Sequence, residues 1–330
     1  MHKDNIDLSI KGEVLFNEPM SRHTSFKIGG PADTLVFPID EDDIVNILRY
    51  ARDNNMPWCV LGRGTNILVK DKGIRGIVIK TEKILNKINI LNNILEVSAG
   101  FILPKLVRFT QEMELSGLEF VAGIPGNIGG AVAMNAGVKD KCIGDLVSKA
   151  YGVSGSGEKQ EWEKEELDFG YRHSIFTPLE NANKISGSDN SSSLCKSDAN
   201  SLTGFNLGKN IITKVELSLS KDSPQAIKER IDEFIKKRKE TQPLEYPSAG
   251  SVFKNPPDEK YASKLIDMAG CKGLQIGSVM VSEKHAGFII NTDPPNANAS
   301  DVLSLISEIK KRVNEQFGVN LETEIKIIGE

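Results

Sequence analysis

A glycine-rich loop over residues 120–137 is the part of the sequence best suited to bind a phosphate group. It holds five glycines and an internal proline within otherwise apolar sequence. Glycine loses the most backbone entropy on folding, so such a run indicates positive φ angles or close approach of a ligand to the main chain. Its N–H groups can bind a diphosphate, and the alternative is a set of tight turns in a sandwich or barrel. The candidate contacts are Gly123, Ile124, Pro125, Gly126, Gly129 and Gly130.

A second glycine-rich turn precedes this loop and lies between two runs typical of β-strands. Its candidate residues are Gly62, Arg63, Gly64, Thr65 and Asn66. The threonine and the asparagine can hydrogen-bond a phosphate. Neither loop is followed by G-K-[ST], which excludes a Walker A motif, and neither fits the G-x-G-x-x-G pattern of a Rossmann unit well. Two separate loops predict an extended dinucleotide that is held from two sides.

Three further segments, far apart in the sequence, carry side chains suited to acid–base or charge chemistry. They are residues 170–174, 247–256 and 321–325. Each also has an ordinary interpretation, with Arg172 as a surface ion-pair partner, Ser251 as a turn residue, and Glu324 on the solvent face of a strand. The four histidines lack the spacing of metal ligands, so no bound metal is expected. Acid–base chemistry is therefore sought among Ser, Tyr, Lys, Arg and carboxylates.

Length and charge narrow the class of protein. With 330 residues the chain exceeds a usual single core, so two or three domains are expected. The 41 Lys and Arg residues against 45 Asp and Glu give a net charge of −4, which argues against nucleic acid as a partner. The four cysteines form no C-x-x-C pair, and no apolar stretch has the length of a membrane span. We expect a soluble cytoplasmic protein without a membrane or an obligate protein partner.

Hydrophobic periodicity predicts an α+β chain. Strands are expected at 34–38, 58–61, 77–79, 95–99, 146–153, 211–219, 287–290 and 322–328, and helices at 42–54, 104–113, from 224 onward and at 301–317. Ser223 and Pro224 begin the third helix, whose basic run 236–239 is interpreted as a solvated face. Ser300 is the expected cap of the last helix and Gly318 its stop.

Residues 181–204 differ in composition from the rest of the chain. The segment is rich in serine and asparagine and poor in apolar side chains. It therefore buries too little surface to order itself, and we expect a flexible surface insertion. The alternative is a lid that folds over a ligand.

Six motifs, in order along the chain, resemble the UDP-N-acetylenolpyruvoylglucosamine reductase (MurB) family. They are SRHTSFKIGG at 21–30, the loop at Gly62, GIPG at 123–126, YRHS at 171–174, GSVFKNP at 250–256 and LETE at 321–324. The match covers nearly the whole chain. Six motifs in order are far more specific than any one glycine loop.

The resemblance implies a flavoenzyme of the vanillyl-alcohol-oxidase/p-cresol-methylhydroxylase (VAO/PCMH) type. Residues 1–80 and 81–220 would form the two FAD-binding parts, residues 221–317 a smaller α+β substrate-binding domain, and residues 318–330 a strand that returns to the flavin site. FAD would be bound non-covalently, since the loop at Gly62 has no histidine for a covalent link. NADPH would reduce the flavin. The enolpyruvyl ether of UDP-N-acetylglucosamine would then be reduced to UDP-N-acetylmuramate.

The matching positions imply three catalytic roles. Arg172 would stabilise the negative charge that develops on the substrate's α-carbon and carboxylate, as a guanidinium beside a carboxylate can. Ser251 would give a proton to the α-carbon. Glu324 would hydrogen-bond the intermediate as a neutral acid, which requires a pKa raised by burial.

Substrate contacts carry over from the family less directly. Tyr171, Lys254 and Asn255 match positions near the substrate. Gln242 stands where some members have a lysine that contacts the substrate diphosphate, so Lys239 or Lys254 could supply the charge instead.

Two other functions remain open at this point. One is a flavin-dependent oxidase of the same fold acting on a sugar or hydroxy acid, and the other is a non-catalytic module that binds uridine nucleotides. Retention of Arg172, Ser251 and Glu324 argues against the module. No tyrosine lies between Tyr171 and Tyr246, so the chain resembles the branch without a tyrosine-bearing loop.

Overall fold

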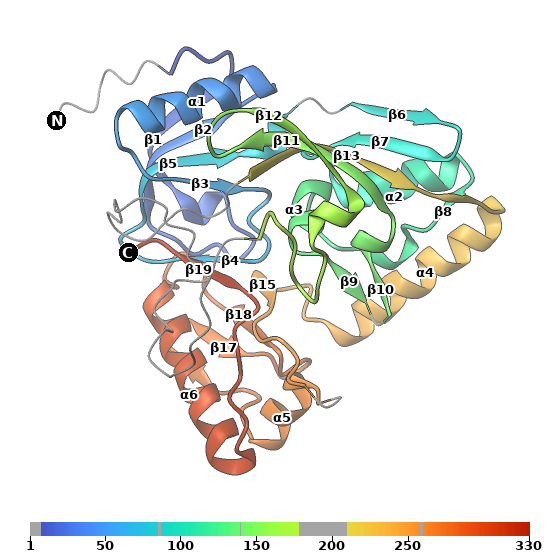
Figure 1. Cartoon of the computed structure of the whole chain (residues 1–330). Coiled ribbons are helices and arrows are strands. Elements are labelled where there is room, and N and C mark those ends of the chain that lie inside the picture. Colours follow the sequence, from blue (N-terminus) through green and yellow to red (C-terminus); the bar gives the residue numbers. More distant parts are fainter. Residues whose placement is uncertain (1–7, 85–86, 139, 178–209, 258–259) are drawn as a thin grey trace, which may run out of the picture.

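The computed structural model describes residues 8–84, 87–138, 140–177, 210–257 and 260–330. Within these ranges the chain forms three packed parts, each built on a β-sheet with buried apolar side chains (Figure 1). The predicted insertion at 181–204 lies outside the described residues. None of the helices in the described part of the chain has the length and apolar character needed to cross a lipid bilayer.

The first part is a four-stranded sheet packed against one helix. Its strands, in spatial order, are β1 (Glu13–Pro19), β2 (Pro31–Phe37), β5 (Ile74–Lys80) and β3 (Trp58–Leu61). β1 is antiparallel to β2, whereas β2 and β3 are each parallel to β5. Helix α1 (Glu41–Asp53) buries Ile44, Ile47, Leu48 and Ala51, which share one face at helical spacing. The predicted strand–helix–strand unit is confirmed.

The second part is a five-stranded antiparallel sheet. Its strands, in order, are β12 (Lys159–Glu163), β11 (Val147–Ser154), β13 (Asn210–Ser218), β7 (Ile94–Ser98) and β6 (Ile88–Leu91). Helices α2 (Leu103–Glu112) and α3 (Ile128–Ala133) contribute to its core. The sequence did not indicate α3, because its glycines mask the helical pattern. Asn127 caps α3 by accepting a hydrogen bond from Gly130 N at 3.1 Å.

Helix α4 (Pro224–Thr241) also packs on the second core and runs along the edge of this part (Figure 1). Ser223 caps it as predicted, accepting from Ala226 N at 3.2 Å. Ile227 and Ile231 are buried in the second core. The predicted substrate-binding segment, 221–317, therefore does not pack as one unit, because the apolar face of α4 packs on the core of the second part.

The third part is a four-stranded antiparallel sheet with two helices. Its strands, in order, are β15 (Ser248–Ser251), β18 (Phe288–Asn291), β17 (Val279–Val281) and β16 (Gln275–Ile276), and its helices are α5 (Ala262–Met268) and α6 (Ala299–Phe317). Gly318 ends α6 at a φ of 67°, as predicted. The predicted cap is wrong, because Asn298 accepts from Asp301 N whereas Ser300 N and Oγ donate to Asp71 of the first part.

The C-terminal segment connects the third part to the first. Strand β19 (Lys326–Ile328) pairs in parallel with β4 (Ile67–Val69) (Figure 1). β4 directly follows the glycine loop at 62–66. The predicted strand at 322–328 is divided, because residues 322–324 pair instead with residues 252–254. The remaining short strands are β8 (Leu115–Ser116), β9 (Gly137–Val138), β10 (Lys141–Cys142) and β14 (Ser220–Lys221). Short 3-10 helices lie at Met20–Arg22, Thr81–Lys83, Glu119–Val121, Ile143–Asp145 and Lys164–Leu167.

Candidate active site

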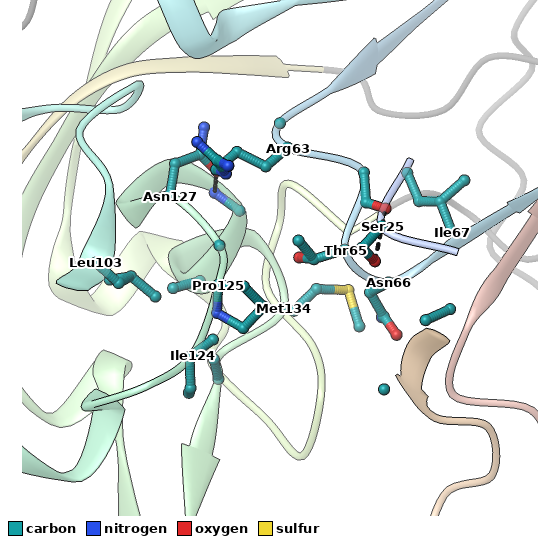
Figure 2. Close-up of a pocket in the computed structure, with 18 of the residues that line it drawn as sticks. Ser25, Arg63, Thr65, Asn66, Ile67, Leu103, Ile124, Pro125, Asn127 and Met134 are labelled. Atoms are coloured by element: carbon teal, nitrogen blue, oxygen red, sulfur yellow. Dashed lines mark hydrogen bonds between the residues drawn. The ribbon is translucent and has the colours of Figure 1, made fainter. Parts of the chain in front are cut away.

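Both glycine-rich loops line one cavity, which also contacts the third part and the C-terminal segment. The cavity has a volume of about 600 Å³, within the usual range for ligand sites. Figure 2 shows Thr65 and Asn66 of the loop at 62–66 facing Pro125 and Ile124 of the loop at 120–137. Every cofactor residue predicted from the two loops lies in its wall. These are Gly62, Arg63, Gly64, Thr65, Asn66, Gly123, Ile124, Pro125, Gly126, Gly129 and Gly130.

The glycines of the two loops serve different purposes. Gly64 has a φ of 66°, and a Cβ there would lie 2.4 Å from the His23 carbonyl oxygen. A Cβ on Gly62 would lie 2.5 Å from Asn127 Oδ1. Gly64 therefore needs glycine for the fold itself, whereas a side chain at Gly62 would have to displace the Asn127 amide that caps α3. Gly126 has no such constraint, because a Cβ there would come no closer than 3.6 Å to other atoms, which leaves its backbone open to the cavity.

Arg172, Ser251 and Glu324, which are far apart in the sequence, all line this same cavity. Arg172 Nε donates a hydrogen bond to Glu324 Oε1 at 2.8 Å. Glu324 N donates to the Val252 carbonyl oxygen at 2.8 Å, so the main chain at Glu324 is held by the backbone beside Ser251. The Asn66 carbonyl oxygen, in the glycine loop at 62–66, accepts from Lys326 N at 3.0 Å and holds the same segment from the other side.

Arg172 lies in a tight turn with a left-handed backbone. Its φ is 56°, and the turn is closed by two hydrogen bonds between Gly170 and His173. A non-glycine residue in this region is uncommon, and such strain persists where the surroundings fix the conformation. The turn thereby directs the guanidinium toward Glu324.

Charges in the cavity wall are strongly unbalanced. Among the described lining residues, Glu324 is the one carboxylate, whereas the cations are Arg63, Arg172, Arg238 and Lys326. Burial raises the pKa of Glu324, and the charges of Arg172, Lys254 and Lys326 oppose this rise without cancelling it. The cations favour an anionic ligand, whereas burial, and not these charges, makes the Glu324 carboxyl hold a proton more readily than usual.

The predicted substrate residues divide into two groups. Gln242 lines the cavity, but Tyr171, Lys254 and Asn255 are not among the described residues of its wall. Tyr171 Oη accepts from Asn255 N at 3.3 Å, and Asn255 Oδ1 accepts from Ala262 N at 3.1 Å at the start of α5. In this structure Tyr171 and Asn255 thus connect the Arg172 turn to the third part.

Sequence reasoning missed several residues of the cavity wall, among them Arg238 and Asn127. Arg238 belongs to the run 236–239 that was interpreted as a solvated face, but its Nε is buried and it lines the cavity. Its position three and four residues after Ile235 and Phe234 was the available signal, because these spacings share one helix face. Asn127 was also missed, although an asparagine before a helix is a typical cap.

Three buried side-chain atoms in the described part of the chain have no hydrogen-bond partner. They are Asn127 Nδ2, Arg238 Nε and Gln242 Oε1. All three residues line the cavity. Because buried polar groups are normally paired, their position indicates contacts that a bound ligand completes. The residues therefore fit a polar, anionic dinucleotide.

The fold and this cavity define a flavoprotein with a separate C-terminal domain. Residues 32–159 match the FAD binding domain family, and residues 242–328 match the family described as "UDP-N-acetylenolpyruvoylglucosamine reductase, C-terminal domain". The chain belongs to the UDP-N-acetylenolpyruvoylglucosamine reductase family. The predicted α+β fold class, with a two-part FAD-binding unit and a smaller C-terminal unit, is confirmed.

Relatives named UDP-N-acetylenolpyruvoylglucosamine reductase match nearly the whole chain. A UDP-N-acetylenolpyruvoylglucosamine reductase of Caldanaerobacter subterraneus subsp. tengcongensis is 42% identical over 320 residues, which cover 97% of this chain and 95% of the relative. One of Clostridium perfringens strain 13 is 40% identical and covers 96% of this chain and 93% of the relative. The crystal structure of the reductase (MurB) from Thermus caldophilus has a TM-score of 0.73 at 31% identity, covering 97% of this chain and 100% of that one.

A matched pair of substitutions separates the structural glycines from the open one. Gly64→Ala is expected to lower the free energy of unfolding by roughly 2–4 kcal/mol, because the left-handed backbone and the contact with His23 both oppose a side chain. Gly126→Ala adds the same methyl group without a close contact in the protein. It should leave stability unchanged and weaken FAD binding. Thermal unfolding and flavin titration measure the two effects, and equal stability losses would contradict the distinction.

Proposed function

We propose that this protein reduces UDP-N-acetyl-3-O-(1-carboxyvinyl)-glucosamine to UDP-N-acetylmuramate, with FAD as cofactor and NADPH as reductant. The observation that carries the proposal is that Arg172, Ser251 and Glu324 line the same cavity as the two glycine loops. Its excess of cations suits the diphosphates and the carboxylate of these ligands. As a step of peptidoglycan precursor synthesis, the reaction belongs in the cytoplasm.

The reaction adds a hydride and a proton across the carbon–carbon double bond of the enolpyruvyl group. FAD, which the two glycine loops would hold, would supply the hydride for the terminal vinyl carbon once NADPH has reduced it. Negative charge then develops on the α-carbon and its carboxylate. Ser251 Oγ–H gives its proton to the α-carbon, and the resulting alkoxide recovers a proton from solvent. The enolpyruvyl group thus becomes the lactyl group, with no other bond broken.

Arg172 and Glu324 act on the developing charge. The substrate carboxylate competes with Glu324 for the Arg172 guanidinium, because both are anionic acceptors for the same planar donor. When the Arg172 guanidinium binds the substrate carboxylate, its hydrogen bond to Glu324 weakens. The buried Glu324 carboxyl then has less positive charge beside it. Its pKa, already raised by burial, then rises further. Glu324 is therefore available as a neutral acid that donates a hydrogen bond to the intermediate.

The purified protein gives a direct test. It should be yellow, bleach with NADPH, and oxidise NADPH in a one-to-one ratio with the enolpyruvyl substrate. A reduced flavin that reoxidises rapidly in air and ignores this substrate would favour the oxidase alternative. A colourless protein that binds uridine nucleotides would favour the non-catalytic module.

A further inference from the structure

Asn135 hydrogen-bonds the turn that carries Arg172. The residue is buried, and it is not among the described residues of the cavity wall. Its amide makes one hydrogen bond in each direction. Asn135 Nδ2 donates to the Gly170 carbonyl oxygen at 2.9 Å, and Asn135 Oδ1 accepts from Gly144 N at 2.9 Å. The first of these bonds reaches the end of the turn that the Gly170 hydrogen bonds close.

Asn135 also ends helix α3, which is the ordinary reason for an asparagine at such a position. Its backbone is left-handed, with a φ of 41°. Asn135 N donates to the Val132 carbonyl oxygen at 3.0 Å. Ala136 N donates to the Ala131 carbonyl oxygen at 2.8 Å, and the two bonds form a Schellman motif. Glycine is the usual residue at this position, because it adopts positive φ without strain. The helix end therefore does not account for the amide.

The surroundings of the amide fix its orientation. A backbone N–H faces its oxygen and a carbonyl faces its nitrogen, so one orientation alone satisfies both partners. A Cβ on Gly144 would lie 2.8 Å from Asn135 Oδ1 and 2.7 Å from Phe169 Cγ. Gly144 thus lets the amide and the aromatic ring approach its backbone closely. The Asn135 amide is packed in one position from which it donates to the turn.

The same part of the chain also contacts the Arg172 side chain. Arg172 Nη2 donates to the carbonyl oxygen of Gly137, two residues after Asn135, at 3.4 Å. The segment that follows the turn is tied to α3 as well, because Ser174 Oγ donates to the Ala133 carbonyl oxygen at 2.8 Å. The C-terminal end of α3 therefore supports the turn, the guanidinium and the residues beyond them.

We propose that Asn135 is a positioning residue that holds the Arg172 guanidinium where it meets the substrate carboxylate. The inference rests on the proposed function, in which Arg172 binds that carboxylate. Arg172 has a φ of 56°, and a strained backbone of this kind persists only where its surroundings fix it. Without the hydrogen bond to Gly170 the turn can relax, and the guanidinium moves with it. A displacement of about 1 Å can lower a rate by roughly 100-fold.

Asn135→Gly tests this role, because glycine keeps the left-handed helix end and removes the amide. Asn92→Gly is the matched control, since Asn92 has a φ of 57° but is exposed and lies outside the cavity wall. We expect Asn135→Gly to slow flavin reoxidation by the enolpyruvyl substrate roughly 10–100-fold and to leave flavin reduction by NADPH within about threefold of wild type. The control should change neither half-reaction. Stopped-flow absorbance of the flavin measures both.

Ligand binding to the oxidised protein gives a second measurement that does not depend on turnover. UDP-N-acetylmuramate carries a carboxylate for Arg172, whereas UDP-N-acetylglucosamine lacks it, so the ratio of their dissociation constants reports the guanidinium. Asn135→Gly should lower the relative affinity for UDP-N-acetylmuramate by roughly 10-fold, with the affinity for UDP-N-acetylglucosamine unchanged. In an Arg172→Ala background the same substitution should change this ratio by less than about twofold, because the amide acts through the guanidinium.

Two outcomes would overturn the positioning role while leaving the proposed function intact. One is a folded Asn135→Gly with wild-type rates and a wild-type ratio, and the other is a loss of affinity that is equal for both nucleotides. If Asn135→Gly is unfolded by circular dichroism, Asn135→Asp decides the question in the same measurements. Aspartate tolerates this backbone and still accepts from Gly144 N, but its carboxylate has no donor for Gly170. A wild-type protein that does not reduce the enolpyruvyl substrate would overturn both proposals.

Discussion

Replacing Ser251 with alanine is expected to lower substrate reduction by roughly 10²–10⁴-fold, the contribution typical of a positioned general acid. Flavin reduction by NADPH should stay close to the wild-type rate, because the proposed proton transfer belongs to the second half-reaction alone. Ser251 lies at the end of β15, and the Glu324 segment pairs with the residues that follow it. Stopped-flow absorbance of the flavin measures the two half-reactions separately.

Ser248→Ala is the matched control for this substitution. Ser248 begins the same strand and also lines the cavity, but the chemistry assigned to the site does not involve its hydroxyl. Both half-reactions should therefore remain within a few-fold of wild type. If Ser251→Ala slowed both half-reactions equally, its hydroxyl would serve cofactor placement and the assigned proton transfer would be wrong.

Much of the fold follows from local patterns in the sequence. Helix α1 has its apolar side chains at helical spacing, and the cap and first residue of α4 are correctly predicted by Ser223 and Pro224. Local patterns do not predict a hydrogen-bond partner that is remote in sequence. Ser300 has the chemistry of a cap, but Asp71, which is remote in sequence, takes its hydrogen bonds, and Asn298 caps α6 instead.

The cavity shows the same division between local and long-range information. Glycine at a position of positive φ, as at Gly64, is readable from sequence because few other residues adopt that conformation. The hydrogen bond between Arg172 and Glu324 is not readable, since it joins two segments through a fold that no local pattern specifies. Only the resemblance of the motifs to a known family suggested that these residues act together. The position of Arg238 was accessible in principle from helical periodicity, but the run of like charges around it concealed that signal.

Glu324→Gln is expected to retain more activity than Glu324→Ala, by roughly 10-fold or more. The reason is that an amide keeps a hydrogen-bond donor of similar shape, as a neutral carboxylic acid would provide. If Glu324 instead acted as a carboxylate, both substitutions would be comparably harmful. Rates of flavin reoxidation by the enolpyruvyl substrate in single-turnover experiments compare the two variants directly.

The pH dependence of substrate reduction examines the protonation of Glu324 independently. Burial raises the Glu324 pKa above the usual range for glutamate against the opposing charges of Arg172, Lys254 and Lys326. The neutral form predominates below this raised pKa and is lost as the pH increases through it. The rate of substrate reduction should therefore fall on the basic side in the wild type. In Glu324→Gln this limb should disappear, because an amide does not titrate. A limb that persists unchanged in the variant would assign the ionisation to another group and remove the neutral-acid role from Glu324.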